Sequence, residues 1–181
     1  PRTEHAILEQ NGIDLLFQGL IQKEKCTVRY ERGASFAYYN KERGMHFRTM
    51  IERGKFGNHP DPQIFYFLGS LAAQEYIDSD IFDEVDCLVP VPLHPRRLRQ
   101  RGFNQAEYIC KGLSDVLHIP IDTEHLVRTR NNPHQSRSEF AQRKDNVKDL
   151  FAIRYPEEWK NKPILLVVDV VTSGSSMVVC V

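Results

Sequence analysis

The chain of 181 residues contains no run of about 18 consecutive apolar residues, so its sequence offers no candidate membrane-spanning helix. Its first residues lack the basic, apolar and small-residue order of a signal peptide, and we therefore expect a cytoplasmic protein. The formal net charge is zero at pH 7, which argues against a uniformly basic, nucleic-acid-binding surface. Internal repeats and low-complexity tracts are also absent. Since 41% of the residues are apolar, one domain with a proper core is expected.

Cysteine is scarce, and none of the four cysteines is paired with another at the spacing of metal ligands: Cys26, Cys87, Cys110 and Cys180. Cys87 and Cys110 lie within apolar segments. This pattern predicts reduced thiols that act as small hydrophobic side chains in a cytosolic protein. No metal site held by protein side chains is predicted.

The apolar residues that are present recur at helical spacing in some segments and in short continuous runs in others. We expect helices at 41–54, 62–77 and 103–118, and strands at 35–39, 86–92 and 164–168. Strands that alternate with helices predict an α/β domain with a mainly parallel sheet flanked by helices. Ligands of such folds bind at the carboxyl ends of the strands, where the loops 92–102 and 169–176 begin.

The loop after the last strand combines one carboxylate, Asp169, with a turn rich in hydroxyl groups: Thr172, Ser173, Gly174, Ser175 and Ser176. Free backbone N–H groups at a helix N-terminus bind phosphate, and a glycine lets the phosphate approach them. Asp169 can accept hydrogen bonds from sugar hydroxyls. These residues suit a phosphorylated sugar, although a capped helix after an ordinary strand would have the same composition.

Four arginines and a histidine follow the strand at 86–92: His94, Arg96, Arg97, Arg99 and Arg101. A guanidinium group can bind two phosphate oxygens at once and keeps its charge at any physiological pH. This loop is therefore a candidate binding site for pyrophosphate. A solvated basic loop and a binding site for single-stranded nucleic acid are the alternatives that the residues leave open.

Three segments resemble, in the same order, motifs of the ComF family of phosphoribosyltransferase-like proteins, which are linked to DNA uptake in competent bacteria. They are 89–105, 126–151 and 167–177. The resemblance covers roughly 30–181 and implies the fold of type I phosphoribosyltransferases. It divides the chain into an N-terminal segment, 1–33, and a phosphoribosyltransferase-like domain, 34–181, which stops within the helix after the last loop. The paired cysteines of the zinc module of many ComF proteins are missing, and 1–33 would lie downstream of such a module.

The same resemblance implies a site for 5-phosphoribosyl-1-pyrophosphate (PRPP). Its 5′-phosphate would bind at Thr172 to Ser176 and its ribose at Asp169, while Val168 stands where the family places a first acid. Pyrophosphate would lie near His94 to Arg101 with Mg²⁺, which PRPP itself would mainly hold. The segment that carries Arg128, Arg130 and Gln135 would close over the substrate, and its arginines would stabilise the leaving group.

Three functions are consistent with these residues. The first is an enzyme that transfers the phosphoribosyl group to an unidentified nitrogen acceptor and releases pyrophosphate. The second is a DNA-uptake accessory without catalysis, which uses its arginines for single-stranded DNA or a helicase partner. The third is a sensor that binds PRPP or a nucleotide without turnover.

Overall fold

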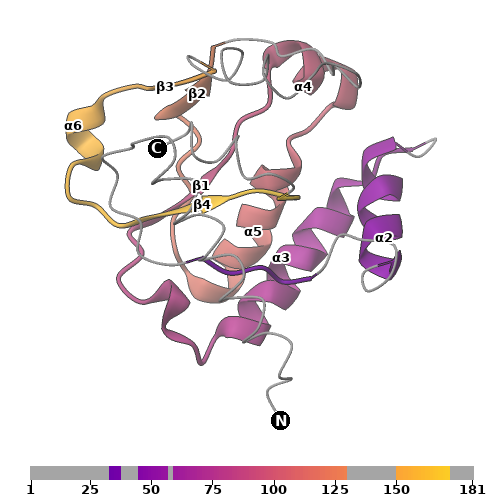
Figure 1. The fold of residues 1–181 in the computed structure, drawn as a ribbon, viewed down its shortest axis with the longest axis horizontal. Helices are drawn as coiled ribbons and strands as arrows, with labels where there is room; N and C mark the ends of the chain where they lie inside the picture. The colour runs from indigo at the N-terminus through magenta and orange to yellow at the C-terminus, as the bar shows by residue number, and fades with distance from the viewer. Residues whose placement is uncertain (1–32, 38–44, 57–58, 130–149, 172–181) are drawn as a thin grey trace, which may run out of the picture.

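The computed structural model describes residues 33–37, 45–56, 59–129 and 150–171. Helices and strands follow one another singly or in pairs along the chain, and Figure 1 shows how they are arranged in space. Strand β4 runs from the side of helix α6 towards the side of helix α2, and these two helices lie at opposite sides of the molecule (Figure 1). Their bounds are Met45–Phe56 for α2, Pro156–Trp159 for α6 and Ile164–Val167 for β4.

A small parallel sheet forms the centre of the domain. Strand β1 (Cys87–Pro90) pairs with β4 in parallel, with Leu88 opposite Leu165 and Pro90 opposite Val167. On its other edge, Leu88 forms a parallel bridge with Ile121. Three of its four residues are buried. Leu88 belongs to the core on one face and Val89 to a separate cluster on the other, and burial on both faces explains the uninterrupted apolar sequence of β1.

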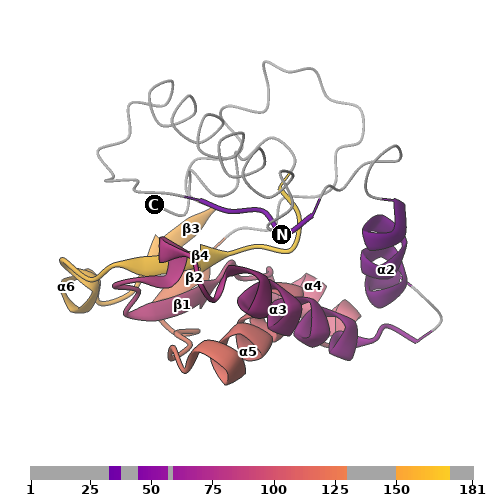
Figure 2. The same ribbon diagram turned by 90° about the horizontal axis from the view of Figure 1, so that it is seen from below.

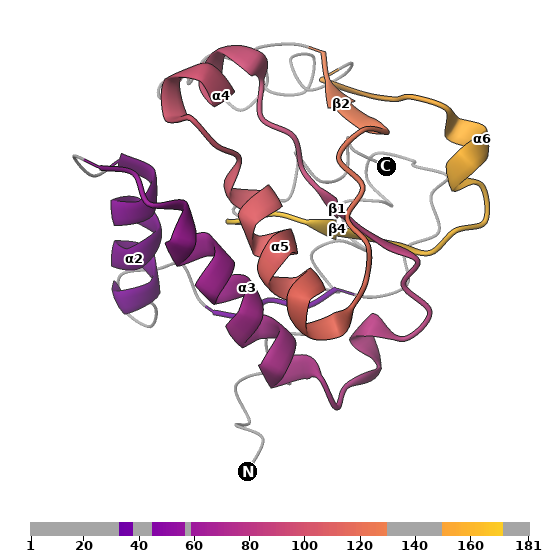
Figure 3. The ribbon, with the colours of Figure 1, turned by 180° about the vertical axis from the view of Figure 1, so that it is seen from behind.

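Helices α3 (Pro62–Tyr76) and α5 (Gln105–Leu117) cover one face of this sheet, as the view in Figure 2 shows. Two glycines let the helices approach closely. A Cβ atom on Gly69 would lie 2.2 Å from the backbone oxygen of Ile109, and one on Gly112 would lie 2.1 Å from that of Tyr66. Figure 3 shows the two helices side by side, with α2 next to α3. Larger residues at either glycine would force the helices apart.

The two faces of β4 pack against different layers. Leu165 and Val167 contact the core beneath α3 and α5, which is built on Leu88, Ala73, Cys110 and Leu113. Ile164, Leu166 and Val168 contact a second cluster, whose buried members are Val89, Val91 and Leu126. This alternation follows the two-residue period of a strand and assigns Val168 to the side away from the helices.

An antiparallel pair completes the described strands. Strand β2 (Leu126–Arg128) pairs with β3 (Phe151–Ile153), with Leu126 opposite Ile153, and α6 follows β3. The described residues thus form a mixed helix and strand domain with a small parallel sheet, consistent with the predicted α/β class. The described strands are less uniformly parallel than expected, because β2 and β3 form a second, antiparallel sheet beside the parallel one of β1 and β4.

The helices expected at 62–77 and 103–118 are confirmed as α3 and α5, and the strands expected at 86–92 and 164–168 are confirmed as β1 and β4. The helix expected at 41–54 is confirmed as α2 over its described part, and 41–44 lie outside the described residues. A short 3₁₀ helix, Asp80–Phe82, precedes β1. No described helix is both long and apolar enough to cross a membrane.

Two local predictions are wrong. Residues 33–37 form no strand; side chains hold this segment instead, because Tyr76 donates a hydrogen bond to the backbone oxygen of Ser35 at 2.7 Å and Phe36 packs edge-on against Phe47. The remainder of 35–39 lies outside the described residues. The segment expected as a basic loop at 92–102 contains a helix, α4 (Pro95–Arg101).

Candidate functional site

Helix α4 carries the arginines of the basic segment, and its two ends have clear local causes. Pro95 occupies the first turn, where a proline loses no hydrogen bond, and the ring Nδ1 of His94 accepts a hydrogen bond from the backbone of Arg96 at 3.2 Å. Gly102 ends the helix in the left-handed conformation, with φ of 86°. Arg96 and Arg99 are exposed, whereas Arg97 and Arg101 are half-buried.

His94 serves α4 as a neutral cap. Partial loss of water lowers the pKa of His94, and nearby positive charges lower it further: those of Arg128, Arg96, Arg99 and Arg97. A lowered pKa agrees with a ring nitrogen that accepts, since a protonated imidazole can only donate. The charge of this segment therefore comes from its arginines.

Arg128 is the last residue of β2, and this corrects its expected place in a loop. The guanidinium of Arg128 lies over the ring of Phe151, 5.3 Å from the centroid. Its charge also acts on His94, so strand β2 and the start of α4 lie within electrostatic reach of each other. The structure thus brings Arg128 to the amino end of the arginine-bearing helix.

Asp169 follows β4 and interacts electrostatically with cations from two other elements. Its Oδ2 forms an ion pair with Nζ of Lys55, in the last turn of α2. The half-buried Arg101 is the second cation: partial burial lowers the pKa of Arg101, and the charge of Asp169 acts in the opposite direction. We call Lys55, Arg101 and Asp169 the Asp169 cluster.

The pairing of β1 with β4 brings these segments to one edge of the sheet. Val91 donates a backbone hydrogen bond to Val167 at 2.9 Å, so the chain leaving β1 runs beside the chain leaving β4. Asn104 then fixes the end of the basic segment, because its side chain donates to the backbone oxygen of Val91 at 3.1 Å and caps α5 by accepting from Ala106. The candidate site is this carboxyl edge, with the Asp169 cluster, α4 and Arg128.

The remaining predicted site residues lie outside the described residues: Arg130, Gln135, Thr172, Ser173, Gly174, Ser175 and Ser176. Lys55 was missed by sequence reasoning. It is one of several cations near the end of α2, and no spacing rule connects it with a carboxylate that follows a strand much later in the chain. Only the folded structure identifies Lys55 as the partner of Asp169.

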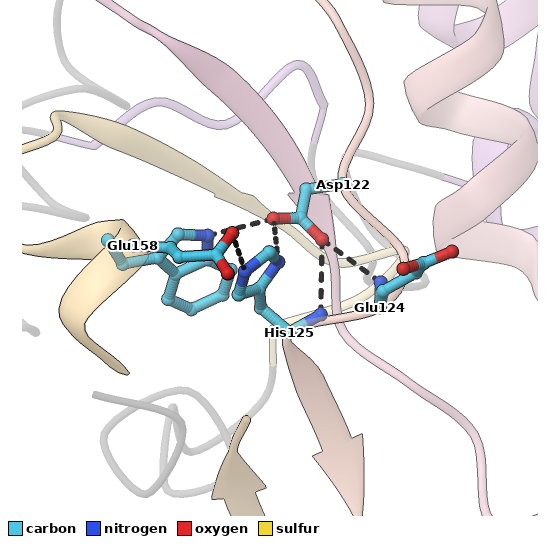
Figure 4. Close-up of polar contacts among 5 residues, drawn as sticks. Asp122, Glu124, His125 and Glu158 are labelled. Carbon is cyan, nitrogen blue, oxygen red and sulfur yellow. Dashed lines mark hydrogen bonds and ion pairs between the residues drawn. The ribbon is translucent and has the colours of Figure 1, made fainter. Parts of the chain in front are cut away.

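A second polar group, the His125 cluster, consists of Asp122, His125, Glu158 and Trp159, and Figure 4 shows it in close-up. Asp122 accepts backbone hydrogen bonds from Glu124 at 3.0 Å and His125 at 3.1 Å, and a third from the indole of Trp159 at 2.8 Å. His125 Nδ1 lies 2.7 Å from Asp122, at ion-pair distance without hydrogen-bond alignment, and Nε2 lies 3.2 Å from Glu158.

The His125 cluster joins α6 to the turn before β2. The imidazole stacks on Trp159 with centroids 5.3 Å apart, and the ring of Tyr155 meets it edge-on. Sequence reasoning did not single out this cluster, because its members come from two separate segments. Within the described residues, neither this cluster nor any other group of His, Cys, Asp and Glu could hold a metal ion.

The expectation for two of the cysteines is confirmed, since Cys87 and Cys110 are free thiols in or beside the core. Burial raises the pKa of both thiols, and nearby carboxylates raise it further. Neither is therefore an activated nucleophile. Cys26 and Cys180 lie outside the described residues.

No protein-family model matches the chain, and no solved structure matches it. Among curated proteins, it is 39% identical over 92 residues to the DNA utilization protein YhgH of Escherichia coli, and 35% identical over 92 residues to that of Salmonella typhi. It is 31% identical over 93 residues to Competence protein F of Haemophilus influenzae. These matches cover 51% of this chain and 40–41% of the relatives. The chain is thus similar, over half of its own length and about two fifths of theirs, to proteins named for DNA utilization and competence, and these names support the resemblance to the ComF family.

Proposed function

We propose that the carboxyl edge of β1 and β4 binds PRPP, and that the protein transfers the phosphoribosyl group to a nitrogen acceptor in a process linked to DNA uptake. One observation carries the proposal. The hydrogen bond from Val91 to Val167 joins the chain leaving β1 to the chain leaving β4, so that the cations of α4 and the carboxylate of Asp169 share one edge. Such an edge is where α/β proteins bind phosphorylated ligands.

The chemistry of PRPP matches the two kinds of side chain at this edge. Ribose hydroxyls would donate to the carboxylate of Asp169, and guanidinium groups would bind the pyrophosphate oxygens. In the reaction the bond from the anomeric carbon to pyrophosphate breaks, and pyrophosphate leaves with the electron pair. The acceptor nitrogen forms the new bond and loses a proton. Arg101 and Arg128 would stabilise the charge that develops on pyrophosphate.

Mg²⁺ would reach this site with the substrate. The described side chains that interact with Asp169 are the cations Lys55 and Arg101, and Lys55 already forms an ion pair with its carboxylate. These side chains do not form a set of oxygen ligands that could hold Mg²⁺ on the protein itself. Oxygens of pyrophosphate and ribose would supply the metal ligands. The proposal that Thr172–Ser176 bind the 5′-phosphate rests on the sequence motif alone. The same holds for the proposal that the segment with Arg130 and Gln135 closes over the site.

Calorimetric titration of PRPP with Mg²⁺ into the protein tests the binding step. We expect saturable binding that Asp169→Asn weakens by about tenfold or more, because a hydrogen-bond acceptor with full charge is lost. Asp83→Asn is the matched control, since it makes the same change at an exposed residue near the 3₁₀ helix. The absence of saturable binding to the wild-type protein would overturn the proposal.

Release of pyrophosphate tests the transfer step. Ammonia and nitrogen bases would be offered as acceptors, and both pyrophosphate and the phosphoribosylated product would be quantified. Equal amounts of the two, which fall in Asp169→Asn, are expected of a transferase. Binding of PRPP without either product would favour a sensor over an enzyme.

One observation favours a second candidate, an accessory protein that binds single-stranded DNA. Phe56 is 70% exposed, and the guanidinium of Arg101 lies over its ring, 5.2 Å from the centroid. Arg101 belongs to α4, which also carries the exposed Arg96 and Arg99. Aromatic rings beside cations bind single-stranded nucleic acid by stacking, and two groups of relatives are named for DNA utilization or competence.

Fluorescence anisotropy with labelled single-stranded DNA tests this candidate. We expect an affinity that falls steeply with salt, and a shallower salt dependence in Arg96→Gln and Arg99→Gln. An affinity unchanged by these variants would argue against this surface, and a helicase partner would then be the remaining form of the accessory hypothesis.

A further inference from the structure

A lysine from the N-terminal half of the chain reaches the proposed ribose-binding carboxylate. Lys55 Nζ forms an ion pair with Asp169 Oδ2, and the two side chains are only 13% and 20% exposed. Water screens such a pair far less than it screens the exposed pairs of the surface. The pair therefore links α2 to the end of β4 and leaves Asp169 already partnered before any ligand is bound.

A second cation acts on the same carboxylate. Arg101 donates to Gln105 Oε1 at 2.9 Å and lies over Phe56, the residue that follows Lys55 in α2. Its charge interacts with Asp169 from the side of α4. The Asp169 cluster thus holds two positive charges and one negative charge, and an anionic ligand would balance the excess.

The residue that precedes Asp169 does not offset this excess, because it is the uncharged Val168. Its side chain packs against the cluster of Val89, Val91 and Leu126. Val170 instead packs on the side of α2 and α3, with Ile51 and Phe65. The chain after β4 therefore turns Asp169 towards helices that carry cations.

We infer that Lys55 is a ligand-binding residue of the proposed site, and this inference rests on the proposed function. When PRPP binds, the ribose hydroxyls replace Lys55 as the hydrogen-bond donors to the Asp169 carboxylate. The ammonium of Lys55 then binds a pyrophosphate oxygen beside Arg101. Lys55 thus supplies charge to the pyrophosphate, the part of the substrate that ribose 5-phosphate lacks. In the absence of pyrophosphate, Lys55 competes with the ribose for Asp169.

This exchange predicts opposite effects of one substitution on two ligands. Lys55→Met keeps most of the side-chain length and removes the charge. We expect it to weaken PRPP binding by about tenfold or more, and to leave ribose 5-phosphate binding unchanged or tighter, because the ribose then has no competitor for Asp169. Lys55→Arg should restore most of the PRPP affinity. Arg53→Met is the matched control, a neighbouring exposed cation of α2.

Calorimetry with both ligands, together with thermal unfolding of every variant, separates the outcomes. If the wild-type protein binds neither ligand, the proposed function fails and this inference fails with it. If the wild-type protein binds both ligands but Lys55→Met weakens both equally or neither, only the role of Lys55 is overturned. Should Lys55→Met be unstable, Lys55→Gln and Lys55→Arg give the same comparison in folded protein.

Discussion

The His125 cluster and the Asp169 cluster both gather charged side chains around one aspartate, yet their partners differ in kind. Asp122 accepts hydrogen bonds from two backbone N–H groups and an indole N–H and lies at ion-pair distance from an imidazole, all from the turn before β2 and from α6 (Figure 4). Asp169 has cations from α2 and α4. The first set closes on itself and holds two segments together, whereas the second leaves an excess of positive charge for a ligand. We therefore expect substitutions in the first to change stability and those in the second to change binding.

The largest expected effect on stability is that of Asp122→Ala. This substitution removes the acceptor of three hydrogen bonds and leaves His125 beside Glu158 alone, so we expect a loss of about 2–4 kcal/mol. Urea denaturation measures the loss, with the exposed Glu124→Ala as a control near zero. PRPP affinity should not change. A parallel loss of affinity would show that the two clusters are not separable.

Val168→Asp adds a carboxylate directly after β4, on the side away from α3 and α5. Since Val168 packs against Val89, Val91 and Leu126, we expect a loss of about 1–3 kcal/mol in the free energy of unfolding. The measurement is again urea denaturation, with Val168→Thr as the control of similar shape. A fully stable Val168→Asp that binds PRPP more tightly would show that the missing acid can be restored without cost.

The pH dependence of stability should show how much the charge of Asp122 stabilises the folded protein. Burial alone would raise the pKa of Asp122, but hydrogen bonds from Glu124, His125 and Trp159 outweigh it and leave the pKa below its ordinary 3.8. A lowered folded-state pKa stabilises the protein above the unfolded value, and this contribution disappears as the pH falls through the folded value.

We therefore expect Asp122→Asn to be less stable than wild type by about 1–2 kcal/mol near neutral pH, with the gap closing below about pH 4. Denaturation curves collected across this range measure the gap. A gap that stays constant with pH would mean that the charge of Asp122 contributes nothing beyond its hydrogen bonds.

Phe56→Ala is expected to cost only about 0.5–1 kcal/mol, the contribution of an exposed cation–π contact. Thermal unfolding measures this effect. The control is Phe67→Ala, because Phe67 is also an exposed phenylalanine but lies on α3. If the edge binds single-stranded DNA by stacking, Phe56→Ala should also weaken that binding by more than Phe67→Ala does.

The smallest effect is expected at Glu52, which forms an ion pair with Arg48 at 2.8 Å within α2. The two side chains are 43% and 34% exposed, so Glu52→Gln should cost no more than about 0.5 kcal/mol. Raising the salt concentration should abolish even this difference. A larger loss would show that exposed pairs of α2 matter as much as the buried pair of Lys55.

Local patterns were sufficient where local interactions decide the structure. Apolar residues at helical spacing predicted α3 and α5, and the continuous branched run predicted β4 and its carboxyl end. Helix α4 was missed because it has no apolar face, although Pro95 and Gly102 are the residues that start and stop a helix. The strand expected near Ser35 was wrong because contacts with helices hold the described part of this segment. Phe36 packs against Phe47 of α2, and Tyr76 of α3 donates to the backbone oxygen of Ser35.

The sequence by itself determined the α/β alternation, the order of the elements and the presence of a basic segment and an acid after two strands. Only the tertiary structure decided that Lys55 pairs with Asp169, that Val168 and Asp169 face opposite layers, and that His125 lies between two carboxylates. The physical reason is the distance along the sequence between the residues that interact. Helix and strand periodicity depend on neighbours a few residues apart, whereas these contacts join segments that become neighbours only when the sheet and its helices pack together.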